Sequence, residues 1–287
     1  MASSSTTSVQ APLRERLRRI SHVALDMDGT IYHGNTLFEF TNPFLAGLTA
    51  LGIGYSFLTN NSSKSVKDYV AHLRKLGVAA APEQIYTSTQ ATLEYLGEER
   101  PAVRRLFVLG TASQAEEVAA AGYIITKDSA TDEPDAVLVG FDMGLTYARL
   151  CRAAYWIKQG KPFIASHPDR VCPTNEPTVL VDCGSICAAL TKATGHEPDA
   201  VVGKPDPRML RGLLHRQHLQ PENLAMVGDR LYTDMDMARR AGTLGVLVLT
   251  GEATAEEARA HTPPLDLVVS NIAEFGEHLR AAREGGA

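Results

Sequence analysis

Two aspartates, Asp26 and Asp28, follow an apolar run and come directly before Gly29 and Thr30. The run, Val23-Ala24-Leu25, is typical of a buried parallel strand. Because strand side chains alternate in direction, carboxylates two residues apart leave the strand end on the same side. They repel each other unless a cation lies between them, and Mg²⁺ prefers oxygen ligands of this kind. The pattern indicates either a metal-dependent catalytic site or an Asp-x-Asp-Gly surface turn.

Three further groups of polar residues each follow an apolar run later in the chain: Thr59 and Asn60, then Lys204, then Asp229 with Asp234 one turn on. Ligands bind outside the carboxyl ends of the strands in an open parallel sheet, so all four groups are expected to converge. Each group also has a structural interpretation. Thr59 and Asn60 suit a helix cap, Lys204 a solvated surface, and Asp229 a turn. Asp234 suits the first turn of a helix, where the helix dipole favours negative charge.

A parallel sheet would bring these residues together, and the hydrophobic pattern predicts one. Apolar runs of strand length alternate with helical patterns, which is typical of an α/β fold. The outer segments are expected to form one parallel sheet with crossover helices, and the middle segment a second α/β layer. Strands are expected at 55–58, 84–88, 106–109, 136–139, 163–165, 179–181, 201–202, 224–227, 246–249 and 267–269. Helices are expected at 43–51, 66–76, 112–121, 146–159, 184–194, 206–218 and 233–242.

The composition argues against several classes of protein. The 287 residues are 44% hydrophobic and carry a net charge of −5, so the overall charge favours neither nucleic acid nor an anionic membrane. No apolar run approaches the roughly 18 residues that span a bilayer. Residues 1–20 are expected to be a flexible segment, because they begin with a polar, Ser/Thr-rich stretch. Arginines follow and suggest a transit peptide as an alternative, but Glu15 interrupts them and a cytoplasmic location is expected.

The four cysteines, Cys151, Cys172, Cys183 and Cys187, are spaced unevenly. Their spacing fits neither a disulfide framework nor paired Cys-x-x-Cys zinc ligands. Cys183 and Cys187 are spaced to share a helix face, where cysteine usually behaves as a small buried hydrophobic residue.

Taken in order, the polar groups resemble the motifs of the haloacid dehalogenase (HAD) superfamily: Asp-x-Asp-Gly-Thr, Thr-Asn-Asn-Ser, Gly-Lys-Pro and Gly-Asp-x-x-x-x-Asp. The insertion between the second and third motifs is similar to the cap of subfamily IIA, the NagD-like and 4-nitrophenylphosphatase-like phosphatases. Ala-Gly-Tyr at 121–123, Ser-His-Pro-Asp at 166–169 and Cys-Gly-Ser-Ile-Cys at 183–187 look like cap features of that branch. The resemblance implies a doubly wound, Rossmann-like parallel-sheet core over 21–90 and 198–287, with an inserted α/β cap domain over 91–197.

The resemblance also implies catalytic roles. Asp26 would be the nucleophile that forms an aspartyl phosphate, and Asp28 the general acid and then the general base. Mg²⁺ would be coordinated by the side chains of Asp26 and Asp229 and by the backbone carbonyl of Asp28. Asp234 would hold the metal's water molecules or Lys204 in place.

Further roles concern the phosphate and the rest of the substrate. Thr59, Asn60 and Lys204 would bind the phosphoryl oxygens. His167 and Asp169 are candidates for substrate selectivity, since related phosphatases usually carry asparagine where His167 stands. The alternative is a histidine that merely fills a loop.

The expected function is that of a Mg²⁺-dependent phosphomonoesterase acting on a small phosphate ester, such as a nucleotide monophosphate or a sugar phosphate. A phosphotransferase or phosphomutase using the same intermediate is one alternative, and a non-catalytic phosphate-binding module is another. A dinucleotide-dependent oxidoreductase is disfavoured, because no Gly-x-Gly-x-x-Gly follows the first strand. The expected partner is a small phosphorylated metabolite, with no nucleic acid or membrane, and a homo-oligomer through the cap is compatible with the resemblance.

Overall fold

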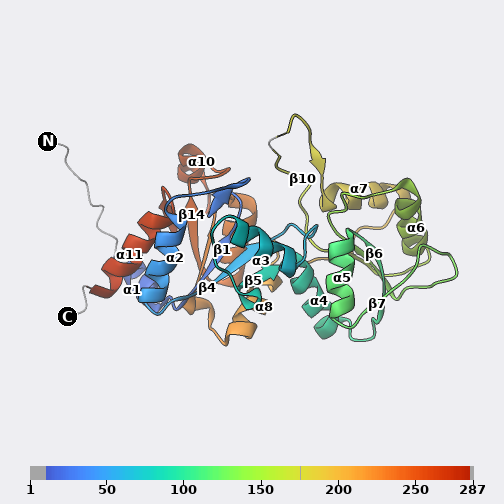
Figure 1. Cartoon of the computed structure of the whole chain (residues 1–287), viewed down its shortest axis with the longest axis horizontal. Helices are drawn as coiled ribbons and strands as arrows, with labels where there is room; N and C mark the ends of the chain where they lie inside the picture. The colour runs from blue at the N-terminus through green and yellow to red at the C-terminus, as the bar shows by residue number, and fades with distance from the viewer. Residues whose placement is uncertain (1–10, 175, 285–287) are drawn as a thin grey trace. The chain divides into compact units, whose positions relative to one another are not determined.

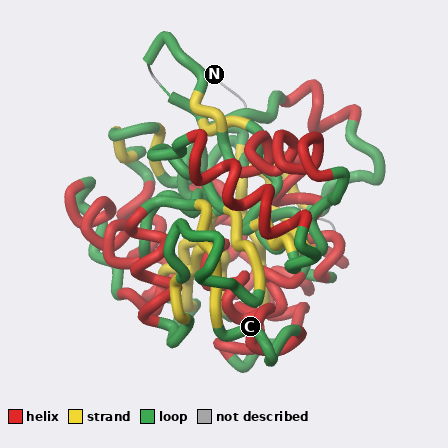
Figure 2. The backbone as a smooth tube through the Cα atoms, turned by 90° about the vertical axis from the view of Figure 1, so that its right-hand side faces the viewer, coloured by secondary structure: helices red, strands yellow, loops and turns green. Residues whose placement is uncertain are grey.

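The chain folds into two compact α/β units, drawn in Figures 1 and 2. The structure, a computed structural model, describes residues 11–174 and 176–284. Unit 1 comprises residues 1–56 and 217–287, and unit 2 comprises Phe57–Arg216. Parallel strands lie between helices (Figure 2), and the predicted α/β class is confirmed. The core and cap boundaries inferred from the family resemblance stay a prediction.

A sheet forms the centre of unit 1. Its strands are His22–Asp26 (β1), Gly54–Thr59 (β4), Leu224–Gly228 (β13), Leu244–Val248 (β14) and Leu267–Val269 (β15). They lie in the order β15-β14-β13-β1-β4, and the pairs β1–β13, β13–β14 and β14–β15 are parallel. All residues of β13 and β14 are buried, as expected for strands that are covered on both faces. A two-stranded ribbon of Tyr32–His33 (β2) and Thr36–Leu37 (β3) follows β1.

Helices cover both faces of this sheet. They are Ala11–Arg19 (α1), Thr41–Ala50 (α2), Asp236–Ala241 (α9), Ala255–Ala260 (α10) and Ile272–Glu284 (α11), with short turns at Pro221–Asn223 (η2) and Leu231–Met235 (η3). The step from β1 to β4 runs opposite to the step from β13 to β14, so right-handed crossovers place α2 and α9 on opposite faces. Helix α11 packs against both α1 and α2, as Figure 1 shows. The sheet is therefore doubly wound, as predicted.

Helix α1 occupies part of the segment that the sequence predicts to be flexible. Residues 1–10 lie outside the described residues, whereas Leu17 and Ile20 are buried, with 0% and 1% exposure. Arg18 Nε donates to Ala282 O at 2.7 Å, which joins α1 to α11. Burial of two aliphatic side chains therefore orders residues 11–20, an effect that the basic composition of this stretch conceals.

A second parallel sheet lies in unit 2. Its strands are Arg105–Leu109 (β6), Ile124–Ile125 (β7), Ala136–Val139 (β8), Phe163–Ala165 (β9) and Ala200–Val201 (β12). They lie in the order β12-β9-β8-β6-β7, with all pairs parallel. The chain passes from β6 outward to β7 and then back to β8, which is the flavodoxin-like order. The predicted second α/β layer is therefore present.

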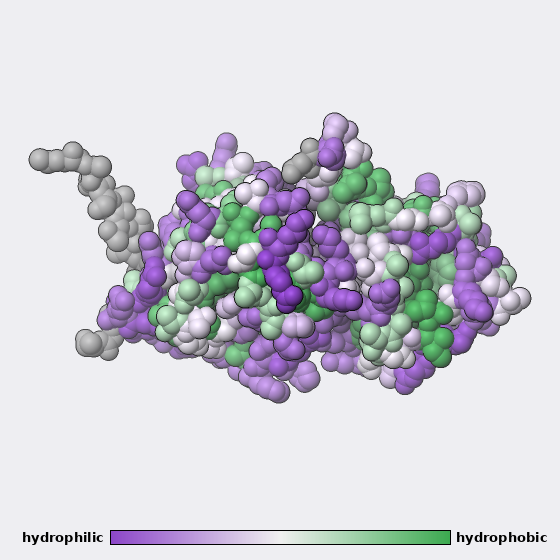
Figure 3. All heavy atoms as spheres, in the orientation of Figure 1, coloured by the Kyte–Doolittle hydropathy of each residue, from purple (hydrophilic) through white to green (hydrophobic). Residues whose placement is uncertain are grey.

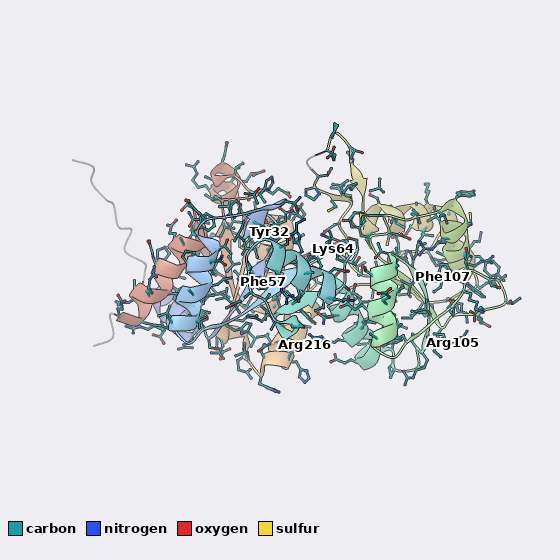
Figure 4. All side chains as sticks on the ribbon, in the orientation of Figure 1. Tyr32, Phe57, Lys64, Arg105, Phe107 and Arg216 are labelled. Atoms are coloured by element: carbon teal, nitrogen blue, oxygen red, sulfur yellow. The ribbon has the colours of Figure 1, made fainter. Side chains whose placement is uncertain are left out.

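The remaining elements of unit 2 surround this sheet or extend the first one. The helices are Val66–Lys75 (α3), Ser88–Glu99 (α4), Ala112–Ala120 (α5), Tyr147–Lys158 (α6), Cys183–Thr194 (α7) and Arg208–Gln217 (α8); the turn Pro82–Gln84 (η1) leads into Ile85–Thr87 (β5), which pairs with the end of β4. Helices α6 and α7 pack together, and α5 packs against α4. Arg216, labelled in Figure 4, fastens α8: its guanidinium lies 4.6 Å from the Tyr86 ring centroid and pairs with Glu94. Among the described residues, no helix is both long and apolar enough to cross a membrane.

The strand expected at 179–181 does not join this sheet. Val171–Cys172 (β10) and Leu180–Val181 (β11) form an antiparallel hairpin instead, near the top of Figure 1. Val171, Val179 and Val181 are 52%, 66% and 58% exposed, and Figure 3 shows apolar residues gathered in this part of the surface. The apolar run thus belongs to a surface ribbon.

Candidate active site

Three carboxylates of unit 1 gather at the carboxyl ends of β1 and β13. Asp26 is the last residue of β1, and Asp229 follows β13 directly. The two strands pair in register, with Leu25 beside Val227, so the aspartates that follow are neighbours. Asp234 comes from the π-helical turn η3. One oxygen from each carboxylate lies within 4.8 Å of the others, and Asp229 and Asp234 are 3% and 0% exposed.

Asp229 carries a buried charge that the described protein groups only partly stabilise. Its Oδ2 accepts a hydrogen bond from Glu252 N at 2.7 Å, whereas its buried Oδ1 has no hydrogen-bond partner. Burial, together with the negative charges of Asp26 and Asp234, raises the pKa of Asp229 to about 7. A divalent cation would relieve both the repulsion and the unsatisfied oxygen, and an all-oxygen donor set suits Mg²⁺. The residues therefore fit this metal.

Glycines make room for the Asp229 carboxylate. Gly29 has φ +83°, and a Cβ there would lie 2.5 Å from Asp229 Oδ2. A Cβ at Gly251 would lie 2.0 Å from the same oxygen. Both positions thus require glycine, and Gly29 requires it also for its left-handed backbone.

One cation of the protein itself lies beside the acidic group. Arg230 Nε is 2.9 Å from Glu252 Oε2. Burial alone would lower the pKa of Arg230, but the charges of Asp26, Asp229 and Asp234 raise it above its usual value. Glu252 thereby contacts Arg230 through its carboxylate and Asp229 through its backbone. Sequence reasoning missed both Arg230 and Glu252, although Arg230 directly follows a motif aspartate.

Asp28 occupies a different environment from Asp26. Its side chain is 46% exposed, and its Oδ1 lies 3.6 Å from His33 Nδ1 and 3.4 Å from Gly34 N. Gly29 N donates to Tyr32 O at 2.8 Å, which closes the turn after Asp28. An accessible carboxyl group on a tight turn is suited to exchanging protons with a bound molecule.

In unit 2, the Asn60 side chain clamps the backbone of Lys204. Asn60 Oδ1 accepts from Lys204 N at 2.7 Å, and Nδ2 donates to Lys204 O at 2.9 Å. The same Nδ2 donates to the Asp169 carboxylate at 3.1 Å. Both amide hydrogens of Asn60 are therefore engaged by the protein, and the buried Lys204 is fixed 144 residues away in sequence. We refer to Asn60, Lys204 and Asp169 as the Asn60 clamp.

Thr59 lies at the end of β4, before a loop that leads to α3. Its Oγ1 accepts from Asn61 N at 3.1 Å, and the loop is also held by Tyr69 OH, which donates to Asn61 O at 3.0 Å. The N-cap of α3 is Ser65, which forms a capping box with Asp68. Thr59 and Asn60 therefore do not cap this helix, so the structural alternative for them is not what the molecule uses.

His167 lies in the interior of unit 2. Its side chain is 0% exposed, with Nε2 3.2 Å from Ser62 Oγ and 3.5 Å from Asp182 Oδ1, and Nδ1 3.6 Å from Asp169 Oδ2. A side chain enclosed in this way has protein groups as its neighbours, which favours a positioning role over direct contact with a substrate. Asp169 is more accessible, with 14% of its side chain exposed.

Comparison with known proteins identifies the family. A family model described as haloacid dehalogenase-like hydrolase matches residues 23–124, and a second model, described as HAD-hydrolase-like, matches residues 201–275. An acid sugar phosphatase of Staphylococcus aureus is 31% identical over 240 residues, which are 84% of this chain and 90% of that protein. The chain belongs to the haloacid dehalogenase superfamily.

Solved structures define the branch of this HAD protein. The 4-nitrophenylphosphatase of Thermotoga maritima is 38% identical and has a TM-score of 0.86, with 91% of this chain and 98% of that one covered. NagD of Escherichia coli K-12 is 29% identical, with a TM-score of 0.80 and coverages of 89% and 98%. A glycerol phosphate phosphatase of Mycobacterium tuberculosis, solved with magnesium, is 31% identical, with a TM-score of 0.82 and coverages of 92% and 77%. The chain is thus a phosphatase of HAD subfamily IIA, as the motifs predicted.

Proposed function

We propose that this HAD phosphatase hydrolyses a small phosphomonoester through an aspartyl phosphate on Asp26, with Mg²⁺ as its cofactor. The observation that carries the proposal is the acidic group at the ends of β1 and β13, in which Asp229 Oδ1 is buried without a hydrogen-bond donor. A protein keeps such a costly arrangement where a cation and a charged substrate compensate for it.

In the first half-reaction, the Asp26 carboxylate would attack phosphorus while the bond to the substrate's alcohol oxygen breaks. Asp28 would give its proton to that oxygen, so the product leaves as a neutral alcohol. Its accessible position on the turn after β1 suits this exchange. In the second half-reaction, Asp28 would take a proton from water, and the resulting hydroxide would release inorganic phosphate and regenerate Asp26.

Positive charge and hydrogen-bond donors must meet the phosphoryl oxygens during both steps. We assign this task to Thr59 and to the ammonium group of Lys204, with Asn60 contributing by holding the Lys204 backbone. The clamp matters because a long lysine side chain positions its charge well only when its backbone is fixed.

Mg²⁺ would be held by the carboxylates of Asp26 and Asp229 and by the backbone carbonyl of Asp28, with Asp234 beside them. When bound, it would neutralise charge on the phosphoryl group and on the nucleophile. A related glycerol phosphate phosphatase was solved with magnesium and also with calcium. Metal selectivity therefore has to be measured for this chain.

The substrate class that we propose is a small phosphorylated metabolite, such as a sugar or polyol phosphate or a nucleotide monophosphate. The named relatives, an acid sugar phosphatase and a glycerol phosphate phosphatase, support the first two. Relative kcat/KM across a panel of these esters would identify the physiological class. Assembly through the cap and a cytoplasmic location stay predictions.

The decisive experiment is to trap the covalent intermediate. Wild-type protein is mixed with 4-nitrophenyl phosphate and Mg²⁺, quenched in acid within the first turnover, and digested for mass spectrometry. We expect a phosphoryl group on the peptide that contains Asp26, together with release of 4-nitrophenol ahead of inorganic phosphate. Phosphate release in step with 4-nitrophenol, and no labelled peptide at any quench time, would contradict the aspartyl-phosphate route.

A further inference from the structure

His167 lies between two carboxylates in the interior of unit 2. Asp169 is on the Nδ1 side of the ring at 3.6 Å, and Asp182 is on the Nε2 side at 3.5 Å. Both carboxylates are themselves mostly enclosed, with 14% and 3% of their side chains exposed. These are ion-pair distances, and Nδ1 has no hydrogen-bond partner among the described residues, so the carboxylates act on the ring by charge: they attract an imidazolium and gain little from a neutral imidazole. Two enclosed carboxylates on opposite sides of one ring therefore favour the cation.

The charge balance around the ring agrees with this geometry. Burial alone would lower the pKa of His167, but the Cys183 sulfur and the carboxylates of Asp169 and Asp182 outweigh it and raise the pKa to about 9. These are the titratable groups that face the ring from the 166–169 segment and from the start of α7. His22, the other buried histidine in the described chain, behaves oppositely: burial lowers its pKa to about 4, and its ring faces Ser56 at 2.9 Å.

The carboxylate that His167 contacts is part of the Asn60 clamp. Asn60 Nδ2 donates to both oxygens of Asp169, at 3.1 and 3.2 Å, and to Lys204 O. A neutral amide attracts a carboxylate more weakly than a cation does. The charge of the imidazolium thus keeps the Asp169 carboxylate beside Asn60, and the hydrogen bonds from the Asn60 amide set the orientation of that carboxylate.

Close packing leaves the clamp no room to rearrange. A Cβ on Gly203 would lie 2.6 Å from His167 Cβ and 2.6 Å from Asn60 Oδ1. A Cβ on Gly184, at the start of α7, would lie 2.1 Å from Pro168 O. The backbones on both sides of His167 therefore approach one another at glycines, so a change at the ring is transmitted to its neighbours.

The ring also reaches the loop that follows Thr59. Ser62 Oγ lies 3.2 Å from His167 Nε2, accepts from Phe141 N at 2.9 Å, and shares a hydrogen bond with Ser166 Oγ at 3.1 Å. His167 therefore contacts the Thr59 loop on one side and the Asn60 clamp on the other. These are the two backbone segments to which we assign phosphate binding.

We propose that His167 is a positioning residue whose imidazolium, held between Asp169 and Asp182, fixes the Asn60 clamp and so the placement of Lys204. The proposal rests on the proposed function for the role of Lys204 in phosphate binding. In this proposal His167 does not contact the substrate; it acts on Lys204 through Asp169 and Asn60. Selectivity among leaving groups would then remain with Asp169, not with the His167 ring.

The charge state can be tested without substrate. In the full-length protein labelled with ¹³C-histidine, NMR titration should show one imidazole with a pKa near 9 that is absent from His167→Asn. Asp169→Asn should lower that pKa by about one unit or more, because one of the two flanking charges is lost. A pKa below about 7 for His167 would overturn the proposal, because the ring would then be neutral at physiological pH. Stoichiometric metal bound at His167, detected by elemental analysis and lost in His167→Asn, would overturn it as well.

The positioning role is tested on phosphate binding and turnover. His167→Asn should weaken competitive inhibition by inorganic phosphate and lower kcat by about tenfold or more, while circular dichroism stays native. His167→Asn combined with Asp169→Asn should be no worse than the more damaging single variant, since both remove one connected interaction. Additive losses in the double variant would contradict a shared path. His22→Asn is the matched control: it removes a buried histidine in unit 1 and should lower stability without changing phosphate inhibition.

Failure of this proposal differs visibly from failure of the proposed function. Wild-type protein that releases no phosphate from any ester tested would remove the proposed function, whereas the imidazole titration would still report the charge of His167. Active wild-type protein with an unchanged phosphate inhibition constant in His167→Asn would instead remove the positioning role alone.

Discussion

The side-chain amide of Asn60 holds the backbone of Lys204 from both sides. Oδ1 accepts from Lys204 N at 2.7 Å, and Nδ2 donates to Lys204 O at 2.9 Å, although the residues are 144 positions apart. The amide bonds to both the N–H and the C=O of one residue, as the backbone of a neighbouring strand does in a sheet. It joins the loop after β4 to the segment after β12.

Asn60→Ala should therefore impair both stability and catalysis. The change removes the two hydrogen bonds that the Asn60 side chain makes to the buried Lys204 N and O, which we expect to cost about 2–4 kcal/mol in the free energy of unfolding. It should also lower kcat/KM by about 10²-fold, because the Lys204 charge is no longer held in place. Urea denaturation and 4-nitrophenyl phosphate hydrolysis measure the two effects. Asn61→Ala is the neighbouring control: Asn61 Oδ1 accepts local bonds from Ser63, and its loss should cost much less.

Asp26→Asn should abolish turnover and leave the fold intact. An amide is nearly isosteric with a carboxylate but is a very poor nucleophile, so we expect a loss of at least about 10³-fold in kcat. Asp236→Asn serves as the control, because Asp236 lies at the start of α9 and pairs with Arg239. Steady-state assays of both variants, with circular dichroism of each, make the comparison. Activity of Asp26→Asn within tenfold of the wild type would refute the nucleophile assignment.

The sheets could be predicted because their strands are simple in sequence. β8 and β9 match the expected bounds, and β13 departs from them by one residue, since strands buried on both faces are continuous apolar runs between polar turns. Helix α4 was missed even though Thr87 and Gln90 form a capping box, because the small polar residues at its start, Ser88 and Thr89, suit the loop after a strand equally well. The hairpin β10–β11 was misplaced because its valines are apolar but exposed, and exposure is decided by what packs nearby.

Some residues of the candidate site could likewise be predicted from the sequence, and others could not. Asp26, Asp229 and Asp234 could be grouped from sequence, because Asp26 and Asp229 stand at the ends of apolar runs and Asp234 follows Asp229 by about one turn. The Asn60 clamp could not, because its partners are distant in sequence and the amide bonds to backbone atoms, which leave no residue signature. His167 was expected either to select the substrate or to fill a loop, and its full burial was not foreseen, since nothing local shows that Asp182 lies beside it. Long-range hydrogen bonds are thus what the sequence conceals.

Asp229→Asn should stabilise the metal-free protein while removing its response to Mg²⁺. The pKa of Asp229 is raised to about 7, so ionisation of this carboxyl group costs stability in the metal-free fold. The cost is absent below about pH 4, where the group is protonated in both states, and complete above about pH 7. The stability difference between variant and wild type should therefore grow over this window, to an order of 2–4 kcal/mol. Thermal unfolding in chelator from pH 4 to pH 8 tests it, and equal stability at pH 8 would contradict it.

Activity should require Mg²⁺ and fall when Ca²⁺ replaces it. Ca²⁺ takes more oxygen ligands at longer distances than Mg²⁺, so it would draw the Asp26 carboxylate into a coordination that hinders attack on phosphorus. Protein stripped with chelator should regain activity with Mg²⁺ and not with Ca²⁺, although both ions should raise the unfolding temperature. Full hydrolysis in excess chelator would show that the acidic group does not need a metal.

Two buried histidines should give the stability a maximum between mildly acidic and alkaline pH. The pKa of His167 is raised to about 9, so its contribution is complete below about pH 6.5 and is lost as the pH rises toward 9. The pKa of His22 is lowered to about 4, so its contribution is complete above about pH 6.5 and is lost as the pH falls toward 4. Each shift corresponds to an order of 3 kcal/mol. Urea denaturation across this range should show that His167→Asn flattens the alkaline limb and His22→Asn the acid limb. An alkaline limb unchanged in His167→Asn would mean that the ring is neutral in the folded protein.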